Sequence, residues 1–164
     1  MKPGHSPAIV LVACLLLPGL AAAQSAPTLV EAYGRAVALL NYMTTYVGES
    51  LLACVAKGAL SEAQAEARFE AYRVRNAQLL QRAETWSNGM ESRLRAQGEE
   101  REARQRAEEA GLSAIAEASV RAQGEIGNAG NVRALCAAKL ALFESGSYDL
   151  STNAEFVNLL KANP

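Results

Sequence analysis

The amino-acid sequence predicts an all-α protein, an antiparallel bundle of three long helices with two short C-terminal helices, stapled by one disulfide. Ala, Leu, Glu and Arg dominate the composition, while aromatic residues make up only 5%, which favours helices over strands. Apolar residues recur at spacings of three and four along most of the chain, the period of one helix face. Two cysteines, Cys54 and Cys136, remain once the predicted export signal is removed.

The N-terminus has the pattern of a secretory signal peptide. Lys2 supplies the charged start, residues 8–20 form an apolar run, and the small residues 21–23 form a cleavage site. The alternative is a lipoprotein signal ending at Cys14, but three leucines follow that cysteine where a polar tether should begin. We therefore expect residues 1–23 to be removed and the protein to be periplasmic or secreted.

Export of this chain excludes several classes of function. It removes His5, the only histidine, and with it every mechanism that needs an imidazole base or ligand. Without Lys2 the 16 basic residues become 15 against 17 acidic ones, so the exported chain has a net charge of −2. Such a chain lacks the positive charge of a nucleic-acid binder. We expect residues 24–164 to form a single helical domain with no nucleic-acid partner.

Three segments match the capping box, in which a hydroxyl residue and a Glu or Gln three positions later satisfy the free N–H groups at a helix start. Each match opens an apolar-periodic run, which predicts a helix start there. The three boxes are Thr28 with Glu31, Ser61 with Gln64, and Thr152 with Glu155.

The first predicted helix, residues 28–57, is apolar on nearly all faces, which is typical of a helix buried among others. Its main stripe includes Leu40, Val47 and Leu51. A membrane span over residues 36–56 is the alternative, but the polar stretch around Glu49 interrupts the roughly 20 apolar residues that a span requires. We expect no stable membrane insertion.

The second predicted helix, residues 62–97, has apolar residues on one side and Arg and Glu on the other. Glu–Arg pairs at i,i+4 continue into the next helix and contribute only about 0.2–0.5 kcal/mol each. We interpret this charged face as a surface exposed to water. The alternative is that it docks against a partner. The pairs are Glu91 with Arg95, Glu100 with Arg104, and Glu102 with Arg106.

The third predicted helix, residues 99–126, has a stripe of small residues that allows close approach of a neighbouring helix but buries little area. After the break at 127–130, Asn131 is expected to cap a short helix over 132–145, and Gly146 to end it. A last short helix contains Phe156. The alanine stripe, which begins at the end of the second helix, comprises Ala96, Ala103, Ala107, Ala110, Ala114, Ala118 and Ala122.

The two remaining cysteines determine the predicted topology. In an oxidising compartment a lone pair of cysteines favours a disulfide between Cys54 and Cys136. One unbroken helix over 62–126 would span roughly 97 Å and hold them apart, so the chain must reverse. Gly98 is the preferred reversal point, with 87–89 as the alternative. Free thiols, or Cys54 paired with a second chain, would instead favour an extended dimeric rod.

A search for catalytic, metal and cofactor residues identifies none. No nucleophile motif or C-x-x-C is present, and covalent haem attachment would need C-x-x-C-H. Asp149 is the only Asp, whereas calcium loops use several. Glu99, Glu100 and Glu102 are interpreted as solvated charges rather than metal ligands.

The expected function is therefore binding of another envelope protein, as a non-enzymatic adaptor, assembly factor or chaperone-like module, possibly as a homodimer. One alternative is a bundle that binds an apolar ligand or haem non-covalently; another is a weak carboxylate hydrolase. The arrangement of the aromatic side chains distinguishes protein binding from ligand binding. An enclosed cavity would favour a ligand, whereas interlocked side chains would favour a protein partner. The expected lining of such a cavity is Tyr42, Met43, Tyr46, Trp86 and Met90.

Overall fold

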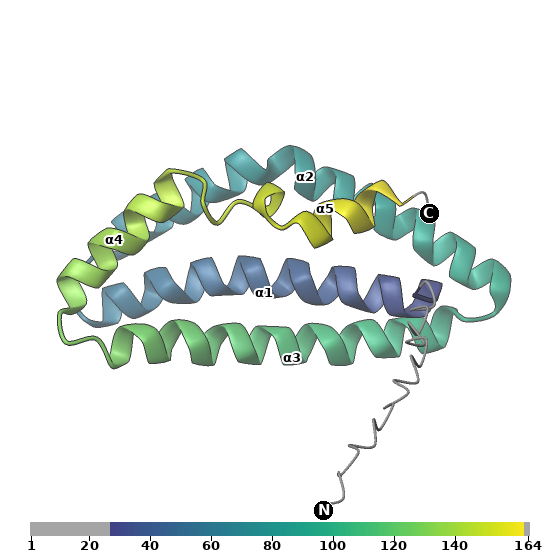
Figure 1. Cartoon of the computed structure of the whole chain (residues 1–164), viewed down its shortest axis with the longest axis horizontal. Helices are drawn as coiled ribbons and strands as arrows, with labels where there is room; N and C mark the ends of the chain where they lie inside the picture. Colours follow the sequence, from purple (N-terminus) through teal and green to yellow (C-terminus); the bar gives the residue numbers. More distant parts are fainter. Residues whose placement is uncertain (1–26, 163–164) are drawn as a thin grey trace, which may run out of the picture.

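The structure, a computed structural model, describes residues 27–162 and is all-α over that range (Figure 1). The predicted signal peptide and Cys14 lie outside the described residues. The three long helices agree with their predicted bounds to within one residue. The helices are α1 (Leu29–Ala56), α2 (Glu62–Gln97), α3 (Glu100–Gly127), α4 (Val132–Glu144), the short 3-10 helix η1 (Leu150–Thr152) and α5 (Ala154–Lys161).

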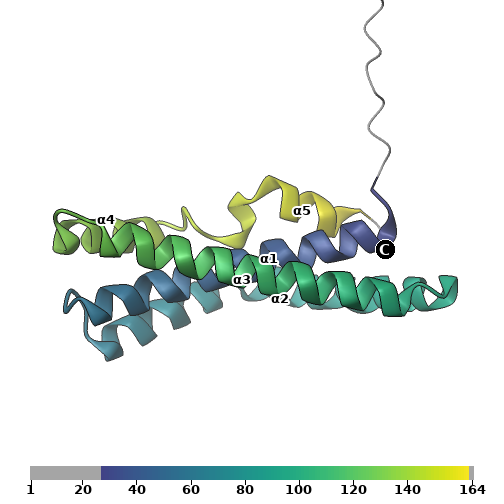
Figure 2. The ribbon, with the colours of Figure 1, turned by 90° about the horizontal axis from the view of Figure 1, so that it is seen from below.

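Helix α1 is central in the bundle. Helix α3 runs beside it along its whole length, and α2 lies on another side (Figures 1 and 2). The return segment of α4, η1 and α5 packs against both α1 and α2. Among the described helices, none is long and apolar enough to cross a membrane.

Two of the three predicted capping boxes are confirmed, at Thr28 and at Ser61, with both reciprocal hydrogen bonds present. The third is wrong. Thr152 ends η1, where its hydroxyl donates to the Asp149 carbonyl, and Asn153 caps α5 by accepting from the Phe156 N–H. Asn131 caps α4 as expected.

The chain reverses at Gly98, as predicted. Gly98 has φ 76° and ψ 12°, a left-handed conformation that suits glycine at a helix C-terminus. The alternative turn at 87–89 lies inside α2. Trp86 and Met90, on either side of it, are both buried, so tertiary packing holds this stretch helical despite its Asn-Gly pair.

The seam between α1 and α3 is built from small residues. A Cβ placed on Gly34 of α1 would lie 3.7 Å from the Arg106 carbonyl oxygen of α3, so the two backbones are close. Two residues of the predicted alanine stripe are not part of the seam between α1 and α3. Ala96 is exposed on α2, and Ala110 is only partly buried because Gly111 takes the inward position. The buried small residues of α3 are Ala103, Ala107, Gly111, Ala114, Ala118 and Ala122.

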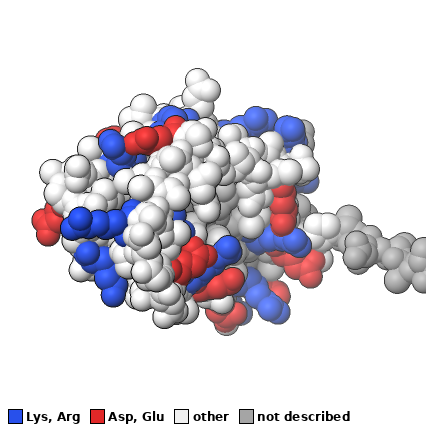
Figure 3. Space-filling model, turned by 60° about the vertical axis from the view of Figure 1, so that its left-hand side comes forward, with Lys and Arg blue, Asp and Glu red and all other residues white. Residues whose placement is uncertain are grey.

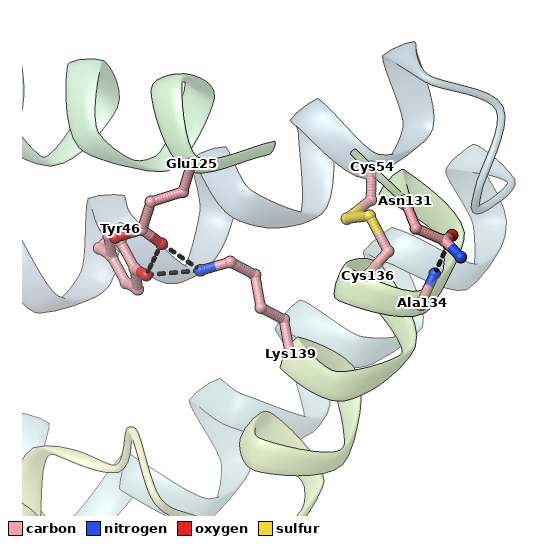
Figure 4. Close-up of a disulfide and its surroundings, with 7 residues drawn as sticks. All are labelled: Tyr46, Cys54, Glu125, Asn131, Ala134, Cys136 and Lys139. Carbon is pink, nitrogen blue, oxygen red and sulfur yellow. Dashed lines mark hydrogen bonds and ion pairs between the residues drawn. A yellow bond between two sulfur atoms is a disulfide. The ribbon is translucent and has the colours of Figure 1, made fainter. Parts of the chain in front are cut away.

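The disulfide between Cys54 and Cys136 is present, as predicted. It joins the end of α1 to the start of α4 with a Cα–Cα distance of 5.9 Å (Figure 4). Both cysteines are buried and pack around Ile126, the last buried residue of α3. The C-terminal ends of α1 and α3 and the start of α4 thus share one small core.

Candidate functional site: an apolar groove between α1 and α2

The aromatic and methionine residues expected to line a ligand cavity do not gather around one. Tyr42, Met43 and Tyr46 line a hollow of only about 70 Å³. Trp86 lines a separate hollow of about 220 Å³ against α5. Met90 packs in the core with an exposed fraction of 2%. These side chains belong to different packing clusters and are used for packing rather than to enclose one cavity.

A buried polar network ties α1, α3 and α4 together (Figure 4). The Lys139 ammonium donates to the Tyr46 phenol oxygen at 2.5 Å and to Glu125 Oε2 at 2.6 Å. The Tyr46 hydroxyl donates to the same carboxylate oxygen at 2.6 Å. On its exposed side, Glu125 accepts from Arg121. Lys139 is only 5% exposed, so the Glu125 carboxylate compensates its ammonium group for the water lost on burial.

The titration of this network argues for a structural role. Burial raises the pKa of Glu125, but hydrogen bonds from Lys139, Tyr46 and Arg121 together outweigh it and lower the pKa to about 2. Burial and the neighbouring carboxylate raise the pKa of Tyr46 well above its ordinary value. At neutral pH the carboxylate is ionised and the phenol keeps its proton, so neither group is poised to exchange a proton with a substrate.

A second polar cluster anchors the chain between α4 and α5. The buried Asn76 amide donates to Asp149 at 3.2 Å, and its carbonyl oxygen accepts from the Leu150 N–H at 2.7 Å. Arg75 pairs with the Asp149 carboxylate and donates to the Phe143 carbonyl. All of these donors and acceptors satisfy each other, which is the pattern of a structural contact.

Surface charges pair across helices as well as within them. Glu100 pairs with Arg104 as expected, whereas Arg95 turns to Glu100 across the Gly98 reversal, and Glu91 reaches Arg104 on α3. In the part of the chain that the structure describes, no three His, Cys, Asp or Glu side chains converge as metal ligands.

A largely apolar groove of about 390 Å³ lies where α1 ends and α2 begins. Each wall is one helical stripe, with residues at i, i+3, i+4 and i+7. We call this feature the Leu52 groove. Its lining is Gly48, Leu51, Leu52 and Val55 on α1, and Glu62, Ala65, Glu66 and Phe69 on α2.

Small residues open the Leu52 groove, and large ones form its sides. Gly48 has no side chain to fill the space beside the Phe69 ring, which lies 3.5 Å from where a Cβ would stand. The floor is the core itself, since Leu51 is 2% and Ala65 6% exposed. Leu52 stands at the rim with 59% of its surface exposed.

A second hollow, of about 380 Å³, lies on the other side of Leu52 toward α3. It is lined in part by Glu49, Lys57, Gln123 and Ile126. Leu52 is therefore an apolar ridge between two hollows, one against α2 and one against α3. With the left-hand side of Figure 1 turned forward, basic and acidic side chains are seen interspersed among uncharged residues (Figure 3).

Sequence reasoning assigned Leu52 to a buried helix and did not single out the groove. The available signal was a helix that is apolar on all faces beside a neighbour, α2, that is apolar on one side only. Such a helix has more apolar surface than its neighbours can cover. Which part stays uncovered depends on where α4 docks, which the sequence pattern does not specify. No protein-family model, curated protein or solved structure matches this chain.

Proposed function

We propose that this chain is an exported, non-enzymatic helical protein that binds another envelope protein, as an adaptor or assembly factor, through the Leu52 groove. The observation that supports it is the exposed Leu52 side chain at the rim of an apolar groove whose floor is the hydrophobic core. Removing apolar surface from water contributes about 25 cal/mol per Å², and this gain must exceed the entropy cost of association. A partner side chain that fills such a groove and excludes water from it is the usual anchor of a protein interface.

The groove suits a protein better than a small apolar ligand. Small-ligand sites enclose most of their ligand's surface. This groove lies between two helices at the surface, and its rim residue Leu52 is largely exposed. Tyr42, Tyr46 and Trp86, which were expected to line a ligand site, pack outside this groove.

Export is part of the proposal and is supported by the signal-like residues 1–23 and by the disulfide. A buried Cys54–Cys136 bond is what an oxidising compartment such as the periplasm permits. N-terminal sequencing of the exported protein should begin at Gln24. A lipidated peptide beginning at Cys14 would contradict cleavage after Ala23 and indicate a lipid-anchored protein.

Site-specific photo-crosslinking in the host tests the binding function. A photoreactive residue at position 52 should give one discrete adduct with another protein. The matched control is position 74, since Val74 is 65% exposed on α2 but lies outside the groove. No adduct at position 52, or the same adducts at both positions, would contradict binding through the groove.

A further inference from the structure

We infer that the occupant of the Leu52 groove is a basic amphipathic helix of the partner, with its apolar side between α1 and α2 and its Lys or Arg side chains against Glu62 and Glu66. This inference rests on the proposed function and specifies the chemistry of the partner.

The shape of the groove favours a helix. Its two walls are antiparallel helical stripes, Gly48–Val55 and Glu62–Phe69, joined through the turn at Gly58. Each stripe spans two turns, or roughly 10 Å. An amphipathic helix with apolar residues at i, i+3 or i+4, and i+7 presents an edge of the same length and period.

The charge of the groove selects a basic partner. The only charged residues in its lining are Glu62 and Glu66, and neither takes part in an ion pair among the described residues. They are one turn apart on the same face of α2, where like charges repel. Glu62 also lies in the first turn, where the helix dipole favours an acidic residue, but Glu66 lies beyond that turn. Two cationic side chains of a partner would neutralise both.

The hollow on the α3 side of Leu52 does not favour a basic partner in the same way. Its charged lining residues are of both signs, Glu49 and Lys57, and Glu49 already accepts a hydrogen bond from Gln123. Charge complementarity therefore identifies the α1–α2 side of Leu52 as the docking side.

Binding of two synthetic peptides to the mature, oxidised protein tests this inference. Both are 18-residue helices with the same leucine face; one has lysines on its polar face and the other glutamates. Fluorescence anisotropy should show that the lysine peptide binds and that the glutamate peptide binds at least tenfold more weakly. Added salt should weaken the lysine peptide's binding.

Paired charge variants locate the contact. Glu62→Gln with Glu66→Gln should weaken binding of the lysine peptide about three- to tenfold, as expected for two partly exposed ion pairs. Glu108→Gln with Glu117→Gln makes the same change in net charge at exposed positions of α3 and should leave the affinity unchanged. Equal losses in the two double variants would overturn the assignment to the groove.

Two further variants test the groove itself. Gly48→Leu should fill it, because a Cβ there has ordinary contact distance to Phe69, and binding should fall at least tenfold. Leu52→Gln, at an exposed helical position, should weaken binding without unfolding the protein. Circular dichroism and the melting temperature check that both variants are folded.

The outcomes separate the two proposals. If neither Gly48→Leu nor Leu52→Gln affects binding, the basic-helix inference is overturned. It is also overturned if the lysine and glutamate peptides bind equally well. If the peptides fail while position 52 still crosslinks to a host protein, the inference is wrong and the proposed function stands. Failure of the crosslink as well contradicts the proposed function.

Discussion

Two buried polar side chains, Asn76 and Lys139, connect the C-terminal segment to the long helices. Asn76 on α2 accepts from the backbone N–H of Leu150, which is itself fully buried. Lys139 on α4 reaches a carboxylate on α3 and a phenol on α1. A buried polar group that loses its partner costs more than the hydrogen bond is worth, because it cannot return to water.

Replacing Asn76 with alanine should lower the free energy of unfolding by about 1–3 kcal/mol, because the Leu150 N–H loses its acceptor inside the core. Chemical denaturation measures the change. Asn88→Ala, at an exposed position of the same helix, should change stability by no more than about 0.5 kcal/mol. Equal effects of the two changes would show that Asn76 is not needed to anchor the loop.

The Glu125 carboxylate should make stability depend on pH. Its pKa is lowered from the ordinary 4.5 to about 2, so its contribution is present above about pH 4.5 and is lost as the pH falls toward 2. Partial exposure to water and salt reduces the size of the effect. Glu125→Gln should destabilise the protein at pH 6 by leaving the Lys139 charge without its partner, and the difference from wild type should shrink by pH 2.5. A difference independent of pH, measured by urea denaturation, would contradict this assignment.

At the scale of elements, the glycines of the long helices have different roles. Gly98 adopts a left-handed conformation that lets α2 end and α3 begin. Gly48 lies inside α1 in helical conformation, with space for a Cβ beside Phe69. The left-handed turn requires a glycine at position 98. At position 48 the glycine lowers helix stability and leaves the groove open.

Alanine substitutions at these two glycines should therefore have opposite signs. Gly48→Ala should raise the free energy of unfolding by about 0.5–1 kcal/mol, because alanine is the better helix former and its Cβ fits. Gly98→Ala should lower it by about 1 kcal/mol, since φ 76° is strained for a residue with a Cβ. Thermal denaturation of both variants provides the comparison. A destabilising Gly48→Ala would mean that the glycine is needed for packing.

At the scale of the whole molecule, the disulfide links the end of the first helix to the helix that follows the other two. Cys54 and Cys136 are 82 residues apart in sequence. In the chain-entropy model a cross-link closing a loop of this length contributes about 4.5 kcal/mol. That is a large share of the stability of a small domain. The cross-link also holds α4 where it covers one side of α1 and leaves the Leu52 side open.

Reduction should lower the melting temperature markedly while preserving much of the helical circular dichroism signal, because the long helices keep their α1–α3 packing when the cross-link is lost. The Cys54→Ser and Cys136→Ser double variant should match the reduced protein. Non-reducing peptide mapping should recover the Cys54–Cys136 peptide from protein purified from the host. Free thiols in that material would contradict both the disulfide and the proposed oxidising compartment.

The sequence by itself determined the helices and the topology. Helix starts are local events, since Thr28 and Ser61 cap the backbone within their own first turn. The position of the reversal depends on the local backbone conformation of Gly98. The predicted pairing of the two cysteines indicated that the chain must reverse between them. The prediction at Thr152 was wrong because Thr152 lies in the η1 turn, where its hydroxyl donates to the Asp149 carbonyl. The Asn153 side chain instead accepts from the Phe156 N–H and caps α5. Local patterns cannot rank such competing hydrogen bonds.

Only the tertiary structure decided which surfaces are covered. The sequence shows that α1 is apolar on nearly all faces, but the docking of α3, α2 and the return segment determines that Val47 is buried and Leu52 is exposed. The same docking brings Lys139 to Glu125 and Tyr46. These contacts join residues far apart in the chain, and helical periodicity describes one element at a time. The groove could therefore be found only once the helices were placed together.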